Sequence, residues 1–119
     1  MSEAILFALD APHVTDLAEA LAFVEENTDS QAAPSAHLAS FFAALVQTWP
    51  EDGSNGGVWH EDFTHNPPSG PVLEMCFELS VFDEALLEDL KTLAAQHGIH
   101  VLDAEGEVLY LADGSKATA

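Results

Sequence analysis

The 119-residue chain contains no arginine and only two lysines, against 21 aspartates and glutamates. Its formal net charge at pH 7 is therefore −19 when the histidines are neutral. Nucleic acids, phosphorylated substrates and anionic membranes all need cationic side chains to neutralise them, and this chain has almost none. The shortage of positive charge argues against nucleic-acid and membrane binding, and it predicts a basic protein as the partner.

Cysteine and long apolar runs are also scarce. Cys76 is the single cysteine, so an internal disulfide is excluded and a reducing compartment is favoured. Residues 1–10 lack a positively charged start and hold only a short apolar stretch, unlike a signal peptide. No apolar run is long enough to span a bilayer. We therefore expect a cytoplasmic protein.

The hydrophobic residues, 48% of the chain, recur periodically. A periodic pattern of this kind predicts a folded protein rather than an acidic disordered one. A chain of this length can bury a core without help from metals or disulfides. We expect one α+β domain over residues 1–119, with residues 113–119 as a loose tail.

The organising stretch of the sequence is residues 72–82. Its odd positions are apolar from Leu73 to Val81, while its even positions include Glu74, Cys76 and Glu78. Alternation with a period of two is typical of a β-strand that buries only one face. The strand is therefore predicted to expose two carboxylates on an open face of a sheet.

The remaining pattern predicts helices beginning at Thr15 or Asp16, at Pro34–Ser35 and at Asp83. Further strands are expected at residues 4–9, 58–63, 99–102 and 107–111. This order favours a split βαβ, ferredoxin-like sandwich. Its sheet would be mainly antiparallel, with about five strands, and its helices would lie on one face.

Residues 59–65 concentrate metal-binding residue types. His60 and His65, with the carboxylates between them, could hold zinc if the chain curled round an ion. On a strand, however, the two histidines point to opposite sides. We expect no metal, and keep a small metal-dependent enzyme that uses His60, His65 and nearby carboxylates as an alternative.

Motifs for other catalytic chemistry are missing. The sequence has no Gly-x-Ser-x-Gly turn, and the acidic neighbours of Cys76 disfavour its thiolate. The glycine-rich segment 53–57 is not followed by the Lys-Ser or Lys-Thr of a phosphate-binding loop. The sequence thus predicts no catalytic residues, no cofactor and no enzyme activity.

The α/β pattern, the acidity and the final segment 98–111, similar to the last hairpin of many small bacterial α/β proteins, together support a resemblance. The chain resembles the small acidic immunity proteins that bacteria keep in the cytoplasm against polymorphic or contact-delivered toxins. The resemblance covers most of the chain and implies an antitoxin. Such a protein would cover the active site of a basic toxin domain, a nuclease in our leading hypothesis.

The predicted contact surface is the open face of the sheet, with an aromatic anchor of the kind that dominates interfaces. It comprises Glu74, Glu78, Asp62, Glu61, His60 and Trp59. The competing surface is the acidic helix faces, with Asp16, Glu19, Glu84, Glu88 and Asp89. A mimic of a nucleic-acid duplex is another alternative, and would show one long regular acidic stripe. Adaptation to high salt would produce the same surplus of acidic residues.

Overall fold

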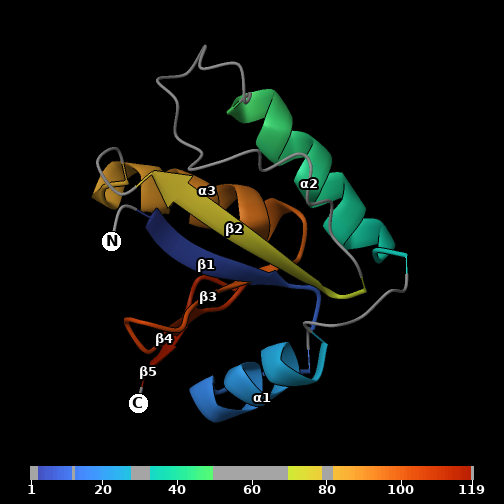
Figure 1. Cartoon of the computed structure of the whole chain (residues 1–119), viewed down its shortest axis with the longest axis vertical. Helices are drawn as coiled ribbons and strands as arrows, with labels where there is room; N and C mark the ends of the chain where they lie inside the picture. The colour runs from blue at the N-terminus through green and yellow to red at the C-terminus, as the bar shows by residue number, and fades with distance from the viewer. Residues whose placement is uncertain (1–2, 12, 28–32, 50–69, 79–81, 119) are drawn as a thin grey trace.

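The computed structural model describes residues 3–11, 13–27, 33–49, 70–78 and 82–118 (Figure 1). The predicted strand at residues 58–63 lies outside these ranges. The described helices are α1 (Leu17–Asn27), α2 (Ala36–Thr48) and α3 (Glu84–Gln96). The described strands are β1 (Glu3–Leu9), β2 (Val72–Glu78), β3 (His100–Asp103), β4 (Val108–Tyr110) and β5 (Lys116–Thr118).

The five strands form one sheet in the order β2-β1-β3-β4-β5, and every neighbouring pair is antiparallel. The predicted α+β class and antiparallel sheet are confirmed. Because β2 and β3 both run antiparallel to the β1 strand between them, they are parallel to each other. The unit β2–α3–β3 is thus a split βαβ unit, and β3, β4 and β5 extend it as a meander.

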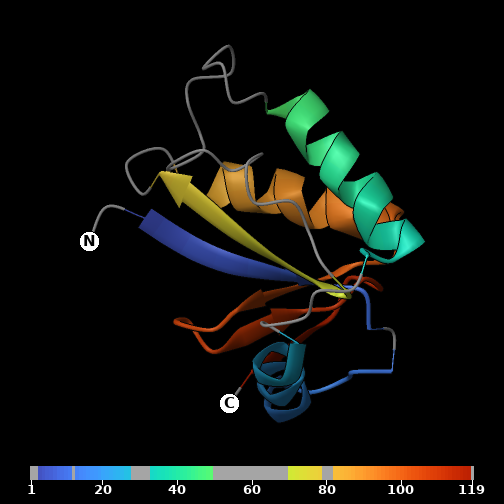
Figure 2. The ribbon, with the colours of Figure 1, turned by 45° about the vertical axis from the view of Figure 1, so that its right-hand side comes forward.

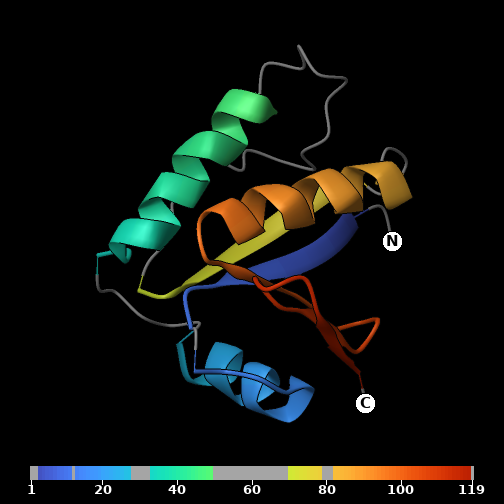
Figure 3. The ribbon, with the colours of Figure 1, turned by 180° about the vertical axis from the view of Figure 1, so that it is seen from behind.

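Helices cover both faces of the sheet. Leu6 and Ala8 of β1 belong to the core that includes α2 and α3, whereas Leu9 belongs to the core that includes α1, with Phe7 packed against it. Figures 2 and 3 show α2 and α3 on one side of the sheet and α1 on the other. The expectation that the helices share one face is therefore wrong for α1.

The position of α1 follows from the apolar residues of β3 and β4. Leu102 and Leu109 lie directly opposite each other and are fully buried on the α1 side of the sheet. Apolar side chains on the face of a sheet have to be buried by another element. The α1 helix covers it with its buried stripe of Leu17, Ala20 and Val24.

The segment expected to be a loose tail contains strand β5. A turn precedes the strand, in which the Asp113 carboxylate accepts a hydrogen bond from the Ser115 backbone N–H at 2.9 Å. Gly114 has a φ of 95°, which favours glycine, and the Leu111 N–H donates to the Ser115 carbonyl at 2.8 Å. This turn returns the chain beside β4, so residues 116–118 are not loose.

The helix starts lie where capping residues predicted them. Asp16 accepts from the Glu19 N–H at 2.8 Å, Ser35 from the Leu38 N–H at 3.3 Å, and Asp83 from the Leu86 N–H at 2.9 Å. Each bond satisfies a backbone donor that has no partner within the helix. These side chains thus fix the points at which the three helices begin.

Replacing the Asp83 cap should destabilise the protein. Asp83→Ala removes the acceptor for the Leu86 N–H, and we expect the free energy of unfolding to fall by about 1 kcal/mol. Asp83→Asn keeps a capping oxygen and should lose much less. Urea unfolding followed by circular dichroism measures both variants, and equal losses would show that the cap is not the cause.

Candidate functional site

Within the part of the chain that the structure describes, the open part of the sheet lies on the α1 side of β1 and β2, beyond the region that α1 covers. Glu74 is exposed there, while Cys76 and Glu78 are half-buried. In the strand register Glu74 pairs with Phe7 and Cys76 with Ile5, and these two apolar side chains are also half-buried. We call this surface, made of Glu74, Cys76, Glu78, Ile5 and Phe7, the β2 acidic face.

The β2 acidic face combines charge with apolar contact area. At the rise of a β-strand Glu74 and Glu78 are about 13 Å apart, too far to act together on one bond. Each can instead meet a separate cationic group on a partner, with Ile5 and Phe7 supplying apolar area beside them. The arrangement is therefore suited to binding a surface rather than to acid–base catalysis.

The other residues predicted for this surface lie outside the described ranges. Trp59, His60, Glu61 and Asp62 are among them, as is His65. Of the predicted contact set, the structure places Glu74 and Glu78 on one strand face. The part of the chain that the structure describes contains no cluster of three or more His, Cys, Asp or Glu side chains that could hold a metal ion. Nor does it contain a helix with the length and hydrophobicity needed to cross a membrane.

The acidic helix faces are divided between the two sides of the sheet. Asp16 and Glu19 lie at the start of α1, while Glu84, Glu88 and Asp89 lie on α3, across the sheet. Asp16 is also engaged as a cap, and the Glu88 carboxylate is 2.9 Å from the Lys91 ammonium. These carboxylates therefore do not share one patch, whereas Glu74 and Glu78 do.

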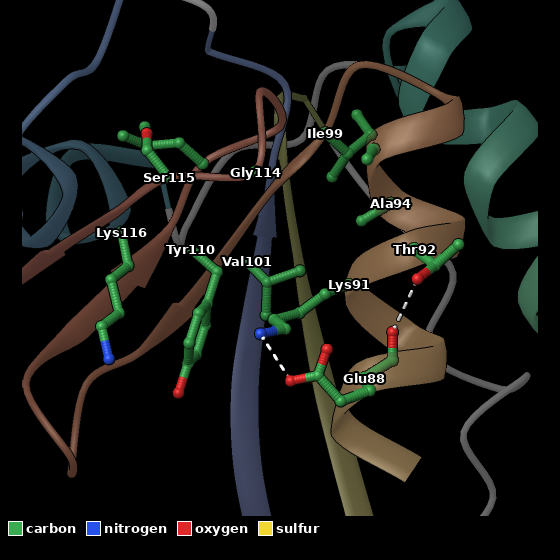
Figure 4. Close-up of a pocket in the computed structure, with 12 residues that line it drawn as sticks. Glu88, Lys91, Thr92, Ala94, Ile99, Val101, Tyr110, Gly114, Ser115 and Lys116 are labelled. Carbon is green, nitrogen blue, oxygen red and sulfur yellow. Dashed lines mark hydrogen bonds and ion pairs between the residues drawn. The ribbon is translucent and has the colours of Figure 1, made fainter. Parts of the chain in front are cut away.

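Sequence reasoning missed a cavity of about 590 Å³ between α3 and the strands β3 to β5. Figure 4 shows that both lysines line it, with the ring of Tyr110 between them. The Lys91 ammonium lies 4.6 Å from the centre of that ring. Lys91 and Lys116 are far apart in sequence, so no local pattern links them. The only sequence feature that could have pointed to this site is the rarity of lysine in the chain. We call this cavity the lysine pocket.

His100, at the start of β3, is the only buried polar or charged residue among those described, with 6% of its surface exposed. Its Nδ1 accepts a hydrogen bond from the Ala112 N–H at 2.9 Å, so Nδ1 carries no proton. Its Nε2 is buried and makes no hydrogen bond of regular geometry to a described residue, although the backbones of Val14 and Ala11 lie near enough to favour the protonated ring. Burial lowers the pKa of His100 below its ordinary value of 6.5, although nearby Asp113 opposes the shift.

The chain was compared with models of protein families, with curated proteins and with solved structures, and none of them matches. A function for the protein therefore has to be argued from its own charges, contacts and surfaces.

The stability of the fold should decrease as the pH falls through the ordinary pKa of histidine. Because burial lowers the pKa of His100, the unfolded chain binds the proton more readily, and acid favours unfolding. We expect the wild type to lose more stability between pH about 7.5 and about 5.5 than His100→Asn, whose side-chain oxygen accepts without titrating.

Urea unfolding at each pH measures this difference. Carboxylate titration is shared by the two proteins, so it largely cancels in the comparison. Parallel pH profiles for the wild type and His100→Asn would contradict the assignment.

Proposed function

We propose that the protein is an immunity protein, which binds a basic toxin domain and covers its active site with an acidic surface. The observation that carries the proposal is the segregation of charge. Both lysines of the chain line the lysine pocket together with one carboxylate, Glu88, while the other described carboxylates do not line it. A partner therefore meets a surface of one sign wherever else it approaches.

Charge of one sign affects how fast the complex forms. A strongly negative surface attracts a positively charged cleft over about a Debye length, roughly 8 Å at physiological salt. Such steering raises association rates and disfavours acidic partners. Nuclease clefts have to be basic because they bind phosphates, so a nuclease domain is the partner that this surface suits best.

The β2 acidic face is the surface that we assign to the contact. Its carboxylates stand on β2, which is an edge strand of the described sheet and pairs with β1 along its whole length, so little order has to be gained on binding. Ile5 and Phe7 provide apolar area between the charges. The acidic helix faces, in contrast, are divided between the two sides of the sheet.

Neutralisation in this proposal is steric and electrostatic. Glu74 and Glu78 pair with cationic side chains that would otherwise hold substrate phosphates, and the sheet blocks the cleft. No bond is made or broken, so inhibition is stoichiometric and reversible. The protein needs no cofactor for this role.

The first test uses the protein encoded by the reading frame adjacent to this gene. We expect its expression alone to arrest bacterial growth and its co-expression with the present chain to restore growth. The two purified proteins should also form a stable complex in size-exclusion chromatography. A neighbouring protein that is harmless, or that does not bind, would overturn the proposal.

The second test reverses charge on the β2 acidic face. Glu74→Lys with Glu78→Lys should weaken binding to that same partner at least about tenfold, mainly through faster dissociation. Glu26→Lys with Glu105→Lys makes the same change in net charge at exposed positions away from β2. Surface plasmon resonance at two salt concentrations separates the two effects.

The control pair should lower the association rate at low salt and leave the dissociation rate near that of the wild type. Equal effects from the two pairs would mean that only total charge matters. In that case the β2 acidic face would not be the interface.

A further inference from the structure

Both of the chain's lysines converge on one cavity, although they come from different elements. Lys91 lies on α3 and Lys116 begins β5, and both line the lysine pocket. A protein with 21 acidic residues could place its two cations anywhere on its surface, to relieve repulsion or to stay soluble. In this protein, both of them line one hollow.

The pocket has an apolar floor and a polar rim. Ile99 and Val101 line it and are each 1% exposed, and the ring of Tyr110 lies beside them. Thr92 and Ser115 stand on opposite sides, from α3 and from the turn before β5. Small-molecule sites usually measure about 300–1,000 Å³, and the volume of about 590 Å³ is within that range.

The charges that line the pocket leave one positive charge unbalanced. Lys91 is balanced by Glu88, whose carboxylate is 2.9 Å away, and it also lies over the Tyr110 ring. Lys116 makes no ion pair with any residue that the structure describes. One anionic group at Lys116 would therefore neutralise the pocket.

We propose that the lysine pocket binds a small amphipathic monocarboxylate. The carboxylate accepts hydrogen bonds from the Lys116 ammonium, and the apolar body lies against Tyr110, Ile99 and Val101. Figure 4 shows the Lys116 side chain and the Tyr110 ring side by side along the pocket. A ligand with a carboxylate joined to a flat apolar body would therefore contact both.

The charge of the whole chain restricts the ligand further. A phosphate ester or a polyanion would bring two or more negative charges toward a protein of net charge −19 that offers a single unbalanced cation. A neutral molecule would leave Lys116 without a counter-charge. A monoanion with an apolar body would both neutralise Lys116 and pack against the apolar residues that line the pocket. This site is independent of the β2 acidic face and has the opposite polarity.

Phenylbutyrate is a suitable probe, and phenylbutyramide is its uncharged counterpart. We expect phenylbutyrate to shift the backbone amide signals of Gly114, Ser115 and Lys116 in proton–nitrogen NMR spectra in a saturable manner. Because an exposed ion pair contributes up to roughly 1 kcal/mol, the amide should bind about fivefold more weakly. Equal affinities, or no saturable shift at these residues, would overturn the proposal.

Lys116→Gln tests the cation directly. The residue is exposed, so the variant should fold, and we expect it to bind phenylbutyrate about fivefold more weakly and phenylbutyramide unchanged. Gln47→Glu, at an exposed position on α2 that does not line the pocket, lowers the net charge by the same amount and should bind like the wild type. Equal losses in both variants would assign the effect to total charge and refute the site.

Discussion

The shortage of cations is the constraint on which this fold depends. With two lysines for 21 carboxylates, the chain cannot pair its acidic groups internally, and an unpaired buried carboxylate is very costly. The described core is therefore apolar except for His100. Acidic residues remain at helix starts, on exposed helix faces, in turns and on the open part of the sheet. The shortage of cations thus accounts both for the apolar core and for a surface on which negative charge predominates.

Local features of the fold could be predicted because short-range chemistry determines them. Ser35 and Asp83 identified helix starts by their capping groups, and the alternation around Glu74 identified β2 and its exposed side. The face of the sheet on which α1 packs could not be predicted. An apolar stripe shows that one side of a helix is buried, but it does not show which element buries it. Lys116–Thr118 is too short and polar to be recognised as a strand, and it depends on the preceding turn and on β4.

The candidate sites differ in how far the sequence reveals them. Glu74 and Glu78 belong to one strand, so their spacing alone placed them on a common face. The lysine pocket lies between α3 and the strands β3 to β5, and its residues come together only when the meander folds back beside the helix. Under the two proposals, the opposite polarity of the pocket gives the molecule two surfaces with different partners, one for cationic groups and one for a single anion.

The central position of β1 has a consequence for synthesis. It is the first described strand to leave the ribosome, yet its neighbours are β2, at residues 72–78, and β3, at residues 100–103. Pairing between such distant segments is slow, because a long loop must close first. An apolar strand stays without its sheet partners until residues 72–78 have been translated. Nascent molecules are therefore the form of this protein most in need of a chaperone.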